Sequence, residues 1–114
     1  MSSHDRIAPR HLFEARILIR LSRDHRNSTL SGWARDLSES GLGAFVGEQL
    51  EMGELVALVV PLSPSGKHEI AARVARKVGT QYGFQFTALS SKQRAAIQAA
   101  LKEQPTVPYP DACR

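Results

Sequence analysis

At 114 residues with 42% hydrophobic content, the chain is long enough for one domain with a hydrophobic core and too short for two independent ones. Its single cysteine, Cys113, cannot form an internal disulfide, which is typical of proteins from a reducing compartment. There is no N-terminal apolar run of signal-peptide length, and no window approaches the ~20 apolar residues that a membrane-spanning helix needs. We therefore expect a soluble cytoplasmic protein with no membrane insertion.

The positive charge is confined to the first third of the chain. Residues 1–35 carry seven arginines and three acidic residues, whereas residues 36–114 carry eight basic and eight acidic residues, so the whole formal excess of +4 precedes residue 36. Arginine has a planar fork of donors that can hold a phosphate or a guanine edge at two points and can stack on flat rings. This distribution indicates an anionic ligand with aromatic faces.

The first third of the chain predicts an extended segment followed by two strands. Pro9 disfavours helix at the residue before it, so residues 6–10 are expected to be extended or turning. Alternation of apolar and polar residues over 14–21 predicts a half-buried strand. The polar, charged residues 22–30 are expected to form a loop, and residues 31–37 a second strand.

The second strand leads into a tight polar corner over residues 36–41. Strict alternation places Asp36 on one face of this strand and Trp33 and Leu37 on the other, with Trp33 as a packing residue. In the corner, short side-chain oxygens are expected to bond nearby backbone N–H groups, and Gly41 and Gly43 are expected to supply backbone freedom. A corner of this composition is common in all-β domains.

The rest of the chain predicts four more strands and one helix. The strands are expected over residues 42–46, 55–62, 67–78 and 82–86. A turn at Gly53, a hairpin turn over 63–66 and a turn over 79–81 connect them. The Ser-x-x-Gln capping box at residues 90–93 predicts a helix over about 90–103.

Six short strands and one late helix indicate an all-β fold, a small closed barrel whose remaining apolar surface the helix covers. Ile97, Ala100 and Leu101 form a short apolar stripe that should lie on the barrel or close its mouth. Three prolines after the helix predict an extended tail.

Two motifs together resemble the signature of the PilZ domain family. The first is Arg-x-x-x-Arg over residues 6–10, and the second is Asp-x-Ser-x-x-Gly over residues 36–41. Their order, their spacing, a strand after each, and the sequence YGFQF at residues 82–86 before a helix make the match specific over about residues 6–101. The resemblance implies a six-stranded antiparallel PilZ-type β-barrel with one C-terminal α-helix that binds cyclic di-GMP.

The resemblance also implies how the chain is divided. Residues 1–12 would be a flexible N-terminal arm that carries the Arg-x-x-x-Arg motif, residues 13–103 the barrel with its C-terminal helix, and residues 104–114 a Pro-rich tail. On this reading the chain is a stand-alone module.

The resemblance assigns roles to five residues of the two motifs. Arg6 and Arg10 would fold over the ligand and contact its phosphates and guanine edges. Asp36 would accept hydrogen bonds from a guanine N1–H and amino group, and Ser38 and Gly41 would bring a hydroxyl and the backbone close to the nucleotide. Phosphodiesters attract cations, guanine O6 and N7 suit a guanidinium fork, and the Watson–Crick donors of guanine suit a carboxylate.

Two further arginines are candidates by position. Arg35, beside Asp36, would be a helper, and Arg76 would stack on a guanine where related proteins often carry a flat side chain. Asp5 next to the first motif would repel a phosphate and reduce affinity. The simpler alternatives are that the motif arginines are solvated charges on a frayed terminus and that the corner residues only cap a turn.

No residue pattern indicates an enzyme, a metal site or a cofactor. The histidines have no metal-ligand spacing; they lie at positions 4, 11, 25 and 68. No Ser-His-Asp, Cys-His or paired-carboxylate set and no glycine-rich phosphate loop is present.

The leading prediction is a receptor or adaptor that binds cyclic di-GMP and passes the signal to an unidentified protein effector, as a monomer or weak homodimer. The alternative is a PilZ-like protein-interaction module that does not bind nucleotide. Non-specific nucleic-acid binding is a third reading, but the neutral charge of residues 36–114 and the shortage of aromatics argue against it.

Overall fold

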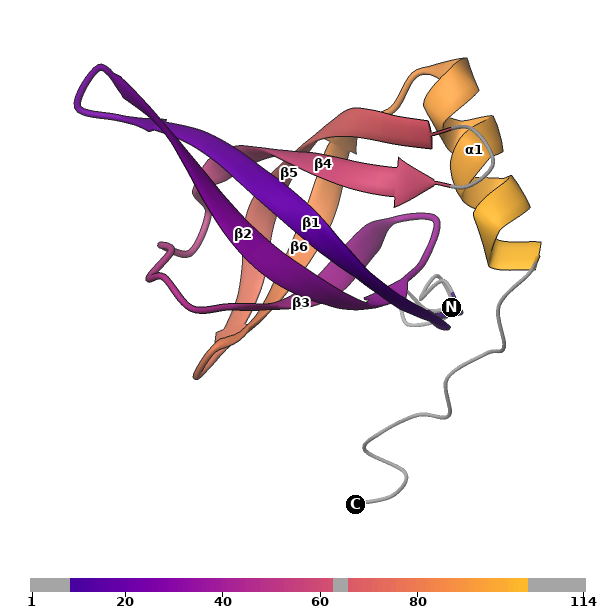
Figure 1. Cartoon of the computed structure of the whole chain (residues 1–114), viewed down its shortest axis with the longest axis horizontal. Helices are drawn as coiled ribbons and strands as arrows, with labels where there is room; N and C mark the ends of the chain where they lie inside the picture. The colour runs from indigo at the N-terminus through magenta and orange to yellow at the C-terminus, as the bar shows by residue number, and fades with distance from the viewer. Residues whose placement is uncertain (1–8, 63–65, 103–114) are drawn as a thin grey trace, which may run out of the picture.

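The computed structural model describes residues 9–62 and 66–102, in which six strands close an antiparallel barrel in the order β1-β2-β3-β6-β5-β4 (Figure 1). The elements are β1 (His11–Arg23), β2 (Arg26–Leu37), β3 (Gly41–Val46), β4 (Leu55–Leu62), β5 (Gly66–Val78), β6 (Gln81–Ala88) and α1 (Ser91–Lys102). The expected barrel with one C-terminal helix is therefore confirmed, and the last four strands lie where the sequence predicts them. The predicted turn residues 63–65, Arg6 and the tail fall outside the described residues.

The expected loop over residues 22–30 is wrong, because β1 and β2 continue through most of it as a long hairpin. The two strands pair as far as Arg23 opposite Arg26, and the turn is only Asp24 and His25. Both turn residues have positive φ, 51° and 64°, which matches the twist of the flanking strands. The hairpin projects beyond the barrel (Figure 1), so its polar composition reflects exposure on both faces.

Strict alternation also fails in β2, at a β-bulge. Ala34 pairs with Ala44 of β3, but the next pair is Asp36 with Gly43, so Arg35 is an extra residue. The bulge turns Leu37 into the core, where it is fully buried, while Trp33 lies on the outside with 46% of its surface exposed. The expectation that these two residues share a face is wrong, and Trp33, expected as a packing residue, lies outside the core.

The core fills the barrel and continues under α1. The inward residues of β5, Ile70, Ala72 and Val74, are buried as expected. The apolar stripe of α1 packs against the same cluster, with Ile97 1% exposed, and α1 contacts β4 at one end of the barrel (Figure 1). Within the described ranges, no helix is long and apolar enough to cross a membrane.

The capping box at the start of α1 is confirmed. The backbone N–H of Gln93 donates to Ser90 Oγ at 3.0 Å, and the backbone N–H of Ser90 donates to Gln93 Oε1 at 3.0 Å. The side-chain amide of Gln93 also donates to the carbonyl of Glu69 in β5 at 2.7 Å. The box therefore both starts the helix and ties it to the barrel.

Candidate functional site

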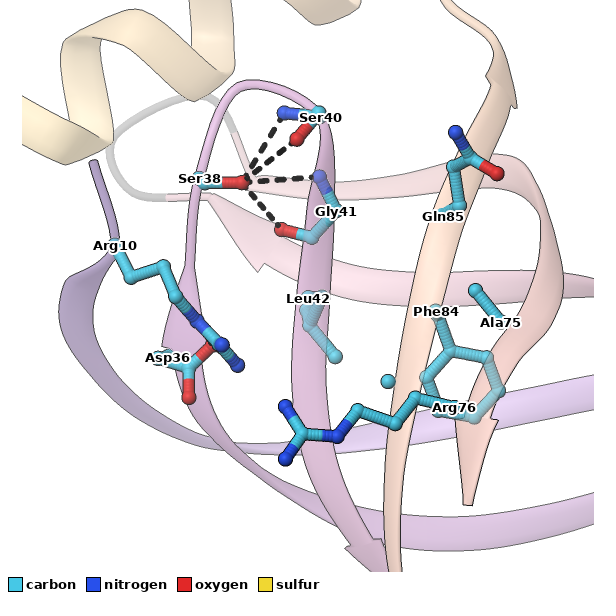
Figure 2. A pocket seen from close by; sticks show the side chains of 11 residues that line it. Arg10, Asp36, Ser38, Ser40, Gly41, Leu42, Ala75, Arg76, Phe84 and Gln85 are labelled. Carbon is cyan, nitrogen blue, oxygen red and sulfur yellow. Dashed lines mark hydrogen bonds and ion pairs between the residues drawn. The ribbon is translucent and has the colours of Figure 1, made fainter. Parts of the chain in front are cut away.

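An ion pair joins the chain segment before β1 to the end of β2. Arg10 donates from Nε and Nη2 to the same carboxylate oxygen of Asp36, Oδ1, at 3.1 and 3.0 Å (Figure 2). The side chains retain 39% and 19% of their exposure. One residue of each sequence motif is therefore held against the other at the barrel surface.

The ion pair lies on the backbone of β3 at Gly43. A Cβ atom at this position would come within 2.9 Å of both Asp36 carboxylate oxygens and 3.2 Å of Arg10 Nη2. Gly43 does not have positive φ, so the expected role of backbone freedom is wrong here. Glycine is needed because the carboxylate and guanidinium occupy the space of a side chain.

A second glycine, Gly83 of β6, lies directly opposite Gly43, and the side chain of Arg76 lies against it. Gly43 pairs with Gly83, Gly83 pairs with Arg76 of β5, and a Cβ at Gly83 would lie 3.1 Å from Arg76 Cβ. A single row across four strands therefore reads Asp36, Gly43, Gly83, Arg76. We call the two central residues the glycine floor; Figure 2 shows Arg10 and Arg76 turned toward β3 from its two sides.

Two bulges make this row possible. In β5, Val74 pairs with Phe84 and Arg76 with Gly83, so Ala75 is an extra residue that turns Arg76 to the outside. The bulge at Arg35 does the same for Asp36 on the other side of the floor. The carboxylate and the guanidinium thus flank the floor because both strands break their alternation.

The corner over residues 36–41 is a compact turn built around Ser38. This side chain is buried, and its Oγ accepts hydrogen bonds from the backbone N–H groups of Ser40 and Gly41, both at 3.2 Å (Figure 2). The backbone N–H of Ser38 donates to the Gly41 carbonyl at 2.9 Å. Ser38 therefore has the expected turn-capping contacts.

Gly41 is required by close packing and not by its dihedral angles. It has no positive φ, which makes the expectation of backbone freedom wrong here too. A Cβ at Gly41 would collide with the carbonyl oxygen of Phe84 on the neighbouring strand β6. The corner is consequently pressed against β6.

These residues line a pocket of about 350 Å³, which lies in the ~300–1,000 Å³ range of small-molecule sites. Its lining residues are Arg10, Asp36, Ser38, Ser40, Gly41, Leu42, Ala75, Arg76, Gly83, Phe84 and Gln85. Two cations, one carboxylate and several neutral polar groups surround an open surface. The arrangement suits a ligand that combines negative charge with hydrogen-bond donors and a flat face.

The structure brings five of the seven predicted site residues to this pocket, namely Arg10, Asp36, Ser38, Gly41 and Arg76. Arg6 lies outside the described residues. Arg35 does not line the pocket, because its guanidinium carbon lies over the ring of Phe45, 5.0 Å from the centroid. β1 begins at His11, and the flexible arm remains a prediction.

Sequence reasoning missed Gln85 and the glycine floor. Gln85 pairs with Gly41 across β3 and β6, and its Oε1 accepts a hydrogen bond from Arg73 Nε at 2.9 Å. This bond leaves the amide NH₂ of Gln85 toward the Gly41 side (Figure 2). The residues of YGFQF carried the only signal, since alternation in that strand turns Gly83 and Gln85 outward together.

No metal-binding group is found in the part of the chain that the structure describes, where no three His, Cys, Asp or Glu side chains gather. The pocket lining presents guanidinium, carboxylate, hydroxyl and amide groups.

Comparisons with known proteins identify the family and the fold. The PilZ domain family model matches residues 4–103. Among solved structures, the PilZ domain of CeSA from a cellulose-synthesizing bacterium has a TM-score of 0.63 and 17% identity, covering 82% of this chain and 95% of that one. The PilZ domain of YcgR from Escherichia coli with c-di-GMP has a TM-score of 0.66 and 21% identity, covering 85% of this chain and 88% of that one.

A third similar structure is the inhibitor of motility MotI/DgrA from Bacillus subtilis, with a TM-score of 0.66 and 15% identity, covering 90% of this chain and 52% of that one. At these identities the structural likeness shows the fold. Comparison with curated protein sequences gives no significant match.

Proposed function

The chain belongs to the PilZ domain family, and from this membership and the pocket we propose that it is a cytoplasmic receptor that binds cyclic di-GMP and passes the signal to a protein partner. Arg6 and Arg10 of the arm and the corner with Asp36, Ser38 and Gly41 would hold the nucleotide. The PilZ domain of E. coli YcgR, whose fold this chain shares, has been solved with c-di-GMP, which supports the choice of ligand.

The observation that carries the proposal is the row Asp36, Gly43, Gly83, Arg76. It places a carboxylate and a guanidinium on the two sides of a pair of glycines, with Arg10 against the carboxylate. A guanine placed at this row can donate N1–H and its amino group to Asp36. Arg76 can stack on the base or bind a phosphate.

The ion pair between Arg10 and Asp36 defines what binding has to change. In the structure described here, the guanidinium occupies Asp36 Oδ1. A guanine edge can replace these donors on the carboxylate, which releases Arg10 to contact a phosphate or guanine O6 and N7. Ligand binding would then shift the population of arm positions, provided that the ligand binds the rearranged arm better than the paired one.

A receptor role without catalysis is consistent with the pocket, whose polar groups are suited to holding an anion. None of the pocket residues forms a nucleophile–base pair of the kind that acyl or phosphoryl transfer uses. We propose no enzymatic activity and no cofactor beyond the nucleotide ligand.

Titration calorimetry with cyclic di-GMP tests the proposal directly on wild type, Arg10→Ala and Asp36→Ala. We expect binding heat for wild type and at least tenfold weaker binding for both variants. The matched control is Arg20→Ala, which removes an arginine of β1 from an exposed ion pair with Glu69, at 3.3 Å and outside the pocket. This control should bind like wild type.

Two outcomes would contradict the proposal in different ways. Unchanged binding in Arg10→Ala and Asp36→Ala would refute the proposed site, but cyclic di-GMP would still be the ligand. Absence of heat with folded wild type would refute the ligand and favour a PilZ-like interaction module that does not bind nucleotide.

A further inference from the structure

Apolar side chains that belong neither to the core nor to the pocket gather on the outer face of the barrel. Trp33, Phe45, Val78 and Leu18 are 46%, 37%, 59% and 36% exposed. We call these four residues the outer belt. Single exposed apolar residues are ordinary in proteins, whereas a contiguous group marks an interaction surface.

The strand pairing places Trp33 directly beside Phe45 and puts Val78 in the same row, with Gln81 between Phe45 and Val78. Trp33 pairs with Phe45, Phe45 with Gln81, and Gln81 with Val78, so one row runs across β2, β3, β6 and β5. Arg16 of β1 pairs with Trp33, and Leu18 is two residues further along the same outer face. Such a diagonal neighbour lies about 7–8 Å away, within reach of a large aromatic side chain.

The outer belt runs beside the glycine floor. Phe45 lies two residues after Gly43 on β3, and Val78 lies two residues after Arg76 on β5. Successive residues of a strand point to opposite faces, so the two rows are neighbours on the same outer surface. Any partner seated on the belt would therefore border the nucleotide pocket and the Arg10–Asp36 pair.

The charges around the outer belt indicate the chemistry of its occupant. Arg16 faces Trp33, Arg35 lies over the Phe45 ring, and Arg76 is in the next row. The outer face of β1 carries one acidic residue, Glu14. A second copy of this chain related by a two-fold axis would bring the same arginines together, which disfavours self-association through this face.

We propose that the outer belt is the docking surface for a protein segment that presents apolar or aromatic side chains flanked by carboxylates. Tryptophan and arginine are the residue types that most often carry binding energy at protein interfaces. Arg16 and Arg35 pair with the carboxylates, and Trp33 and Phe45 pack against the apolar side chains. The inference rests on the proposed role as a receptor that signals to a protein.

The test uses the intrinsic fluorescence of Trp33, the single tryptophan of the chain, as a reporter inside the belt. The probe is a synthetic peptide with leucine and phenylalanine flanked by aspartate and glutamate, titrated into the full chain without nucleotide. We expect a blue shift of Trp33 emission that weakens with added salt. Phe45→Ser and Arg16→Glu should each bind the peptide at least tenfold more weakly.

The matched control is Met52→Ser, which removes a 59%-exposed apolar side chain from outside the belt. It should bind the peptide like wild type. Thermal unfolding of every variant, compared with wild type, shows whether weaker binding reflects a lost contact or a lost fold.

Several outcomes would overturn the proposal. These are no shift with the acidic peptide, an equal shift with a peptide carrying lysine in place of each acid, or an equal loss in Met52→Ser. A shift that only a single-stranded oligonucleotide or anionic vesicles produce would also refute a protein occupant. Calorimetry of Phe45→Ser with cyclic di-GMP separates the two proposals, because nucleotide binding should be unchanged there whether or not the peptide binds.

Discussion

Between β4 and β5 the residues pair without a break from Leu55 opposite Arg73 to Leu62 opposite Gly66, whereas register shifts interrupt β2 against β3 and β5 against β6. The unbroken ladder turns alternate β4 residues into the core and serves packing. The interrupted ladders turn Asp36 and Arg76 outward over the glycine floor. Comparing them shows that the candidate site lies where regular alternation fails, as β-bulges near functional sites often do.

The largest effect should come from removing a core side chain of β4, the strand with the unbroken pairing. Leu58, on the inner face of β4, is 0% exposed, so Leu58→Ala should lower the free energy of unfolding by about 2–5 kcal/mol. Urea denaturation measures this loss. Leu55→Ala on the same strand, where the side chain is 70% exposed, should change stability by less than about 0.5 kcal/mol. Equal losses at the two positions would contradict the assignment of inner and outer faces.

The next effect should separate binding from stability at the glycine floor. Gly43→Ala places a methyl group against the Asp36 carboxylate and Arg10, so we expect cyclic di-GMP affinity to fall at least tenfold, about 1.4 kcal/mol. The stability loss should be smaller than for Leu58→Ala. Calorimetry and urea denaturation measure both quantities.

Gly47→Ala is the matched control for the floor, because a Cβ at Gly47 meets no atom within 4 Å and Gly47 has no positive φ. It should bind nucleotide like wild type. If Gly43→Ala bound equally well, the close contact of Asp36 with the floor would be irrelevant to the ligand.

A subtler change tests whether the fork of Arg10 matters beyond its charge. Arg10→Lys keeps the charge but loses the two parallel donors, so we expect cyclic di-GMP affinity to fall by about three- to tenfold. Arg20→Lys, the same change outside the pocket, should leave calorimetric affinity unchanged. If Arg10→Lys bound cyclic di-GMP as tightly as wild type, Arg10 would contribute only its positive charge and not its forked geometry.

The smallest effect concerns the support of the β5 bulge. Two backbone hydrogen bonds join the turn before β4 to Val74, the residue before the bulge. Val74 N–H donates to the Glu54 carbonyl at 2.9 Å, and Gly53 N–H donates to the Val74 carbonyl at 2.8 Å. Arg23 holds this turn by two hydrogen bonds to the Glu54 carboxylate, at 2.7 and 2.8 Å. The hydrogen bond from Arg23 lowers the pKa of Glu54 below its usual value.

A lowered pKa in the folded state means that ionised Glu54 stabilises the fold above its unfolded-state pKa and that this stabilisation is lost as pH falls. As pH is lowered below about 4.5, the free energy of unfolding should therefore decrease less steeply in Glu54→Gln than in wild type. Urea denaturation across this pH range measures the slope. The exposed Glu39→Gln serves as control and should leave the slope as in wild type.

Local sequence patterns were sufficient for most of the fold and for the two motifs. The valines of β4, the alternation of β5 from Ile70 to Val74 and the Ser90–Gln93 box each act within a few residues, and the structure agrees with all three. The spacing of the motifs indicated the family before any contact between them was visible. Composition misled at the β1–β2 hairpin, because a strand exposed on both faces is as polar as a loop.

The sequence by itself determined the strand number, the helix cap, the location of positive charge and the motif residues, because each depends on neighbours along the chain. Only the tertiary structure decided that Asp36 and Arg76 share a row, that Gly43 and Gly83 lie between them, and that Trp33 faces outward. These features depend on the register between strands, and one extra residue in a bulge reverses every face beyond it. Register is set by packing across the whole barrel, which no local pattern contains.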